Sequence, residues 1–360
     1  MKAKNIFTAI GGVLLVSCAP TQQDNLSEAL KARLIKVSES GGFAIGHHDD
    51  TAYGHTWKYE AGRSDVREVT GDYPAILSWD LGMIEVEAAN NLDGVPFDFI
   101  REQVRKHTAD GGISTFSWHV MNPLTQGNSW DVSGADPVHR AVTPSDSIHQ
   151  VMTEWIGNAA DFFLSLKDTP VIFRPWHEHT GTWFWWGLDQ CTKDDYIAMW
   201  KMTRQIFDEK GVKNVVWAYS PDKSNCGGIE DYLDRYPGDE YVDIMGADVY
   251  HLGGEEGVEQ YSEWMHNTLG AAVEAAKAHG KIAALTETGA ESVPMTNWFT
   301  EVLMPLIKDY PIAYICLWRN AHDQEKHFYM PYPNHPAAAD LVKFHDMPST
   351  FFLKEISAIK

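Results

Sequence analysis

Residues 148–186 read IHQVMTEWIGNAADFFLSLKDTPVIFRPWHEHTGTWFWW, and this stretch indicates the fold of the whole chain. Apolar side chains recur at three- and four-residue intervals over residues 148–166, which predicts an amphipathic helix. Residues 171–175 form a short apolar run, as in strands that are buried on both faces. A helix followed by such a strand and by a polar, aromatic loop is typical of a parallel α/β sheet.

The same unit repeats along the chain. Further helical patterns cover residues 258–279 and 296–308, and no linker or low-complexity segment occurs after residue 25. The sequence predicts eight strands, at Phe43–Gly46, Ala75–Trp79, Ile113–Trp118, Val171–Pro175, Val215–Tyr219, Val242–Ala247, Ile282–Thr286 and Ile312–Trp318. Eight such units close into a (β/α)8 TIM barrel, so we expect an α/β protein with one catalytic domain over residues 26–360. A doubly wound open sheet is the alternative, although no G-x-G-x-x-G motif follows the first strand.

The charge balance limits the possible partners. The 360 residues include 50 acidic and 29 basic side chains, which gives a formal net charge of −21. Binding to a nucleic-acid backbone depends on Lys and Arg, so we expect no nucleic-acid partner. We expect a monomer that needs no cofactor and acts on a neutral or cationic ligand.

The first residues have the features of a bacterial lipoprotein signal. Lys2 and Lys4 precede an apolar run from Ile6 to Val16, which is too short to span a bilayer. The run leads into Leu15-Val16-Ser17-Cys18, which resembles a lipobox in which Cys18 is lipidated. We therefore expect residues 1–17 to be a signal peptide and residues 18–25 to be a short lipidated tether. Plain secretion with an incidental Cys18 is the alternative.

Lipidation predicts a lipoprotein of the cell envelope that contacts the membrane through its lipid alone. The residues after Cys18 contain no acidic run that would indicate export to the surface. We therefore favour a location facing the periplasm over one on the cell surface.

The four cysteines are too few for a disulfide scaffold in a chain of this length. The cell envelope nevertheless permits disulfides. Cys191 and Cys226 both lie in polar loops after strand-like runs, and we expect them to form a disulfide. Two unrelated loop thiols are the alternative. Cys316 lies within an apolar run, where we expect a buried free thiol.

Two carboxylates occupy the positions where a barrel places its chemistry, the carboxyl ends of the strands. Glu178 follows the fourth apolar run and Glu287 follows the seventh. Retaining glycosidases need two such groups about 5–5.5 Å apart, one as nucleophile and one as acid/base. The alternative is that either glutamate is only the structural partner of Arg174 or Arg319.

The loop after Glu178 is rich in aromatic residues. Residues 183–186 read WFWW and do not lie on a helical face, so we expect at least one of them to stack on a sugar ring. Packing in the core is the alternative. Partial desolvation by Trp176 and Trp183, together with repulsion from Glu287, would raise the pKa of Glu178 and keep it protonated.

A metal centre is the main alternative chemistry. Six histidines near the strand ends could bind a divalent ion: His47, His48, His119, His177, His179 and His251. No H-E-x-x-H motif occurs, and the alternation in His177-Glu178-His179 differs from helical spacing. We therefore expect no catalytic metal. The sequence also has no G-x-S-x-G nucleophile elbow.

Several motifs together resemble the signature of glycoside hydrolase family 26. The most specific is Arg174-Pro175-Trp176-His177-Glu178, followed by GTWFWWG at 181–187. Five others occur in matching order, GHHDD at 46–50, SWH at 117–119, SPD at 220–222, DVY at 248–250 and LTETG at 285–289. His48 stands where the family pattern has glutamine. The resemblance extends over residues 46–320, nearly the whole mature chain, and implies a barrel whose acid/base and nucleophile follow the fourth and seventh strands.

The resemblance also implies a role for individual residues. Glu178 would be the acid/base and Glu287 the nucleophile, with Tyr250 bonded to Glu287 and His177 in contact with the sugar beside the acid. Five more side chains would contact the sugar chain: His119, Trp183 and Trp318 at the cleavage point, Arg319 at the next unit on the glycone side, and Trp130 on the leaving-group side.

Most members of the family are β-1,4-mannanases. The resemblance thus implies a retaining hydrolase that cleaves β-1,4-mannosidic bonds in mannan, galactomannan or manno-oligosaccharides, either internally or with release of mannobiose. Two other functions stay open. One is a β-glucanase or β-1,3-xylanase of the same family, and the other is a non-catalytic glycan-binding surface lipoprotein. The presence of both glutamates argues against the binding protein.

Overall fold

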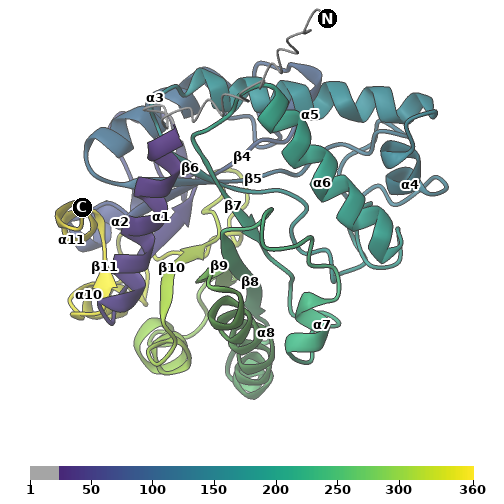
Figure 1. Ribbon diagram of the computed structural model, residues 1–360. Helices are drawn as coiled ribbons and strands as arrows, with labels where there is room; N and C mark the ends of the chain where they lie inside the picture. Colours follow the sequence, from purple (N-terminus) through teal and green to yellow (C-terminus); the bar gives the residue numbers. More distant parts are fainter. Residues whose placement is uncertain (1–23) are drawn as a thin grey trace, which may run out of the picture.

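Eight parallel strands form a closed barrel in the computed structural model, which describes residues 24–360 (Figure 1). In chain order they are β1 (Phe43–His48), β4 (Ile76–Asp80), β5 (Ile113–Ser117), β6 (Val171–Arg174), β7 (Val215–Tyr219), β8 (Ile244–His251), β9 (Ile282–Ala290) and β10 (Ile312–Leu317). Each pairs with the next along the chain, and β10 pairs with β1 to close the ring. The predicted (β/α)8 barrel is confirmed. The predicted signal peptide, and the tether up to residue 23, lie outside the described residues.

Helices follow every barrel strand and surround the barrel. They are α2 (Asp65–Thr70), α3 (Phe97–Ala109), α4 (Pro137–Val142), α5 (Ser147–Ser165), α6 (Lys193–Glu209), α7 (Ile229–Leu233), α8 (Val258–His279), α9 (Met304–Ile307), α10 (Ala338–His345) and α11 (Leu353–Ala358). The predicted helices at 148–166 and 258–279 correspond to α5 and α8. None of the helices within residues 24–360 has the length and apolar character needed to cross a membrane.

The helix predicted at 296–308 is divided in the structure. A π-helical segment, η3 (Trp298–Leu303), leads directly into α9. Pro305 has no N–H to donate to the carbonyl of Glu301, so a regular α-helix cannot continue through this position.

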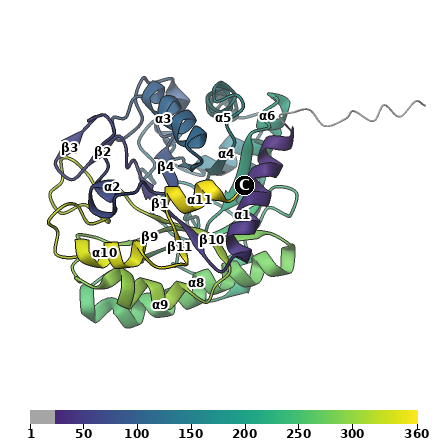
Figure 2. The ribbon, with the colours of Figure 1, turned by 90° about the vertical axis from the view of Figure 1, so that its left-hand side faces the viewer.

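Helix α1 (Asp24–Glu39) closes the amino-terminal end of the barrel. Three of its side chains join the buried cluster formed by inward-facing residues of the strands: Leu30, Leu34 and Val37. Lys31 Nζ binds Asp243, just before β8, and Arg33 donates to the carbonyl of Gly111, just before β5. In Figure 2, α1 lies on the opposite side from the small hairpin of β2 (Tyr53–Gly54) and β3 (Trp57–Lys58), which belongs to the loop after β1. The helix begins at Asp24, so the last two residues of the predicted tether belong to it.

Two strands are longer than the sequence predicts. The apolar runs end at Ala247 and Thr286, but β8 continues to His251 and β9 to Ala290. Polar residues that were expected in loops therefore lie within strands, where the backbone ladder restricts their positions.

Candidate active site

Glu287 of β9 lies opposite Asp248 of β8 because the register of the two strands shifts. Ala247 pairs with Leu285, whereas Asp248 pairs with Glu287, so β9 contains one additional residue, Thr286, at this point. A bulge of this kind changes the direction of the side chains that follow it. Here it brings two carboxylates from neighbouring strands together.

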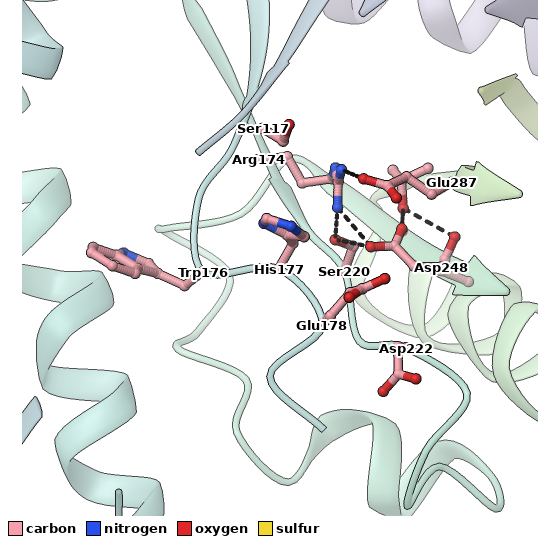
Figure 3. Close-up of polar contacts among 12 residues, drawn as sticks. Ser117, Arg174, Trp176, His177, Glu178, Ser220, Asp222, Asp248 and Glu287 are labelled. Carbon is pink, nitrogen blue, oxygen red and sulfur yellow. Dashed lines mark hydrogen bonds and ion pairs between the residues drawn. The ribbon is translucent and has the colours of Figure 1, made fainter. Parts of the chain in front are cut away.

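Arg174, the last residue of β6, links these two carboxylates (Figure 3). Its Nη2 donates to Glu287 Oε1, and its Nη1 donates to Asp248 Oδ2 at 2.6 Å and to Ser220 Oγ at 3.1 Å. The hydroxyl of Tyr250 donates to Glu287 Oε2 at 2.7 Å. Both oxygens of Glu287 are thus held in place by donors, and a buried guanidinium supplies the positive charge opposite the two carboxylates.

Glu178 faces this group from the loop after β6. Its φ is +54°, in the left-handed region, and its N–H donates to the carbonyl of Ser220 at 2.8 Å. The indole Nε1 of Trp183 donates to Glu178 Oε2 at 2.9 Å. A positive φ at a non-glycine residue costs about 1–3 kcal/mol and persists where surrounding contacts require it. The contact of the backbone N–H with Ser220 and the contact of the carboxylate with Trp183 hold Glu178 in this conformation.

The two glutamates are close to each other but have different surroundings. Burial raises the pKa of Glu178 well above its ordinary value, and repulsion from Glu287, Asp248 and Asp222 raises it further, against the opposing effect of Arg174. One carboxylate oxygen from each of Glu178, Asp248 and Glu287 lies within 4.8 Å of those of the other two. So close an approach is compatible with retaining glycosidases, whose carboxyl groups are about 5–5.5 Å apart, closer than the about 6.5–9.5 Å of inverting ones.

A second group of polar and aromatic side chains lies after β1 and β10. The ring of Trp318 stacks on His48, with centroids 4.2 Å apart. Arg319 Nη1 binds Asp93 Oδ1 at 2.6 Å and the hydroxyl of Tyr53 at 3.2 Å. Trp318 is half-buried and therefore offers part of an indole face at the barrel mouth.

Histidines connect the remaining predicted residues. His119 follows β5, and Trp130, whose side chain is 48% exposed, stacks on its ring with centroids 5.2 Å apart. The Nε2 atoms of His119 and His177 are 3.2 Å apart. His177 in turn packs edge to face against Phe184. An unbroken series of ring contacts therefore runs beside Glu178, from exposed Trp130 to Phe184 in the core.

Two groups of side chains within the described residues place ligating atoms close together. They are Glu178, Asp248 and Glu287, and His48, Asp49 and Asp93. Each group already includes a carboxylate that is paired with an arginine, through Arg174 in the first and Arg319 in the second. We therefore assign neither group as a metal site.

Comparison with known proteins identifies the family. The family model described as glycosyl hydrolase family 26 matches residues 36–303. The chain belongs to glycosyl hydrolase family 26. The sequence resemblance is thereby confirmed.

Other family 26 proteins are similar over much of this chain. A solved GH26 β-mannanase from Bacteroides ovatus is 44% identical, with a TM-score of 0.89, over 94% of this chain and 98% of that one. A mannan endo-1,4-β-mannosidase from Bifidobacterium adolescentis is 28% identical over 82% of this chain, and endoglucanase H from Acetivibrio thermocellus is 26% identical over 53%. The matched region spans 31% and 23% of the length of these last two proteins.

The residues that the family 26 resemblance indicates lie at one end of the barrel. They are Glu178, Glu287, His119, His177, Trp183, Tyr250, Trp318, Arg319 and Trp130. One expectation for the neighbouring aromatic residues is wrong, and the expected sugar contact of residues 183–186 is narrowed to one side chain. Trp176 does not border Glu178, because its Nε1 donates to Thr203 Oγ1 in α6 and its ring points away from the site in Figure 3. Residues 184–186 are buried in the core, so of residues 183–186 only Trp183 is partly accessible.

The predicted disulfide is also wrong, because Cys191 and Cys226 are free thiols. Cys191 Sγ faces the carbonyls of Trp186 and Gly187 and receives a bond from Arg235, while Cys226 packs in the hydrophobic core. Burial raises the pKa of Cys191 to about 11 and that of Cys226 to about 12, so both thiols stay protonated and unreactive. Cys316 is a buried free thiol, as expected.

Two carboxylates of this family 26 site did not stand out in the sequence. Asp248 shares Arg174 with Glu287, and Asp80 binds the ring of His119. Both directly end an apolar stretch of a predicted strand, and Asp248 also begins the DVY motif at 248–250; these are the sequence signals that could have indicated them.

Proposed function

We propose that this chain is a retaining glycoside hydrolase that cleaves β-1,4-mannosidic bonds in mannan, galactomannan or manno-oligosaccharides. The main support is the pair Glu178 and Glu287, which bring one oxygen each within 4.8 Å of the other and have unlike surroundings. Membership of family 26 and the mannan-cleaving relatives support the choice of substrate. Because the chain is also similar to endoglucanase H, β-glucanase activity is the second candidate function.

In the first step, a carboxylate oxygen of Glu287 would attack the anomeric carbon of the sugar. The bond from that carbon to the leaving-group oxygen breaks, and Glu178 donates its proton to the departing oxygen. Tyr250 and Arg174 orient the carboxylate for this attack, since each holds one of its oxygens. The product is a glycosyl ester of Glu287.

In the second step, Glu178 would act as a base. Esterification removes the negative charge of Glu287, and with it one cause of the raised pKa of Glu178. Glu178 then takes a proton from water while the water oxygen attacks the anomeric carbon and breaks the ester. Two successive inversions give net retention.

The surrounding side chains would bind the sugar chain. We assign His119, His177, Trp183 and Trp318 to the sugar at the cleavage point, Arg319 to the next sugar on the glycone side and Trp130 to the leaving-group side. A protein that only binds glycan does not need a protonated carboxyl opposite a carboxylate held by two donors, so a non-catalytic role is disfavoured.

We expect the first product released from mannan to be the β anomer. Proton NMR during the first minutes of digestion measures this before the anomers equilibrate. An α anomer formed first would contradict the double-displacement mechanism. Release of sugars from mixed-linkage β-glucan but not from mannan would favour the second candidate, and binding without any product would favour the non-catalytic one.

We also propose that Cys18 is lipidated and becomes the first residue once residues 1–17 are removed, and that the protein faces the periplasm. The basic residues, apolar run and lipobox-like segment at the start of the chain support this. Protease added to intact cells should leave the protein uncut, whereas cells with a permeabilised outer membrane should lose it. In a Cys18→Ala variant the protein should no longer incorporate labelled fatty acid. Digestion in intact cells would instead place the protein on the surface.

A further inference from the structure

Asp80, at the end of β4, is a fully buried carboxylate that binds four hydrogen-bond donors. Its Oδ1 accepts from the N–H of Gly82 at 2.6 Å and from the N–H of His119 at 3.2 Å. Its Oδ2 accepts from Ser117 Oγ at 2.5 Å and from His119 Nδ1 at 2.6 Å. An ionised carboxylate can only accept hydrogen bonds, so Nδ1 of His119, which contacts it, must carry a hydrogen.

The other ring nitrogen of His119 faces a second histidine. Nε2 of His119 lies 3.2 Å from Nε2 of His177, and two nitrogens at this distance need one hydrogen between them. Nδ1 of His177 is buried and has no hydrogen-bond partner. The three side chains therefore form one continuous row, which starts at Asp80 and ends at Nδ1 of His177, next to Glu178 in the chain.

The row has two complete arrangements of hydrogens, which differ by one proton. With the proton, His119 is an imidazolium that donates to Asp80 and to Nε2 of His177, and Nδ1 of His177 carries a hydrogen. Without it, neutral His119 accepts at Nε2 from His177, and Nδ1 of His177 has only its lone pair. The proton is released to solvent, and every nitrogen keeps its normal valence in both states.

The charges around His119 favour a proton on that ring. Burial tends to lower the pKa of His119, but the charge and hydrogen bond of Asp80 outweigh it, and Glu287 and Asp93 act in the same direction. The net effect is a pKa above the ordinary value for histidine. The pKa of Asp80 is lowered in turn, because His119 and Ser117 outweigh the effect of burial.

The charges around His177 act in the opposite direction. Burial lowers the pKa of His177 well below its ordinary value, and Arg174 lowers it further. Three histidines lower it as well, His119, His179 and His48. The additional proton of the row therefore belongs to His119, and His177 is neutral in both states.

We propose that Asp80 and His119 are positioning residues for His177, and that one proton on their row decides whether Nδ1 of His177 is a hydrogen-bond donor or an acceptor. The importance of this for catalysis rests on the proposed function, because His177 precedes the acid/base Glu178. Loss of the proton changes the tautomer of His177 from Nδ1–H to Nε2–H without changing its charge. A neutral histidine that changes tautomer with pH is the distinctive property of this arrangement.

Nitrogen-15 NMR of histidine rings tests the proposal in the intact protein. Spectra recorded as a function of pH, with His119→Gln and His177→Gln for assignment, should show one transition shared by both rings. Nδ1 of His119 should stay protonated throughout, while His177 exchanges its tautomer. Asp80→Asn should move the transition to lower pH by about one pH unit or more, because the carboxylate charge is lost. Separate transitions for the two rings, or an unchanged midpoint in Asp80→Asn, would overturn the proposal.

Glu85→Gln is the matched control. Glu85 is also a buried carboxylate after β4, but it accepts from Trp118 Nε1 at 3.1 Å and from the N–H of Met121 at 2.8 Å. Its neutralisation should leave the midpoint in place, and an equal shift would show that the effect is not specific to the row. If Asp80→Asn fails to fold, Ser117→Ala retains the charge but removes one donor to Asp80, so the midpoint should rise. These spectra do not depend on turnover. The proposal about the row can therefore be refuted without refuting the proposed hydrolytic function, and the reverse also holds.

Discussion

Replacement of Glu287 by alanine is expected to lower the hydrolysis of mannan by about 10⁴-fold or more while the barrel stays folded. Without this carboxylate there is no nucleophile to form the glycosyl ester. The fold should persist because Arg174 keeps its 2.6 Å contact with Asp248, so no buried charge is left without a partner. Initial rates on mannan, together with thermal unfolding, measure the two effects separately.

Glu291→Ala is a suitable control for Glu287→Ala. Glu291 follows the same strand, but its side chain is 55% exposed and pairs with His327. We expect this variant to keep its activity. Azide offers a further check, because it can occupy the space of the missing carboxylate and attack an activated aryl mannoside. The expected product in Glu287→Ala is the glycosyl azide of inverted, α configuration. A β azide, or nearly full activity on mannan, would contradict the role of Glu287.

Replacement of Glu178 by alanine should have an effect that depends on the leaving group. Mannan needs a proton on the departing oxygen, so its hydrolysis should fall by about 10³-fold or more. An aryl mannoside with a good leaving group needs little protonation, so its kcat/KM should fall far less. The ratio of the two losses, measured on one enzyme preparation, gives the contribution of the acid. Equal losses on both substrates would contradict the assignment.

The pH profile should change in the same variant. Because the pKa of Glu178 is raised, its proton-donating form persists to a higher pH than that of an ordinary glutamate and is lost as the pH rises through the raised pKa. The wild-type rate on mannan should therefore fall on the alkaline side. In Glu178→Ala that descent should disappear from the residual rate. Azide should give a β product here, because Glu287 is still present to form the ester.

The barrel could be predicted because its strands are short apolar runs separated by helical patterns, and both are local signals. The ends of β8 and β9 could not, because Asp248, Tyr250 and Glu287 look like loop residues in the sequence. The interior of the barrel is polar at the carboxyl ends of its strands. The apolar runs of β8 and β9 therefore stop before the backbone hydrogen bonds between the strands do.

The two glutamates could be predicted from their position after apolar runs and from the family motif. The contact between Asp248 and Glu287 could not, because it depends on a register shift between strands. Residues 183–186 show a similar limit, since sequence alone does not distinguish an indole at the mouth from one in the core. The disulfide failed for the same reason: two loops can follow neighbouring strands while Cys191 and Cys226 point to different surroundings.

Helix α1 determines which way the barrel mouth would open relative to a bilayer. It lies across the closed end and begins at Asp24, so only residues 19–23 separate it from Cys18. With lipid on Cys18, as we propose, the bilayer would lie against the end opposite Glu178 and Glu287. A mannan chain would then reach the barrel mouth without touching the lipid surface, and anchoring would not obstruct the substrate.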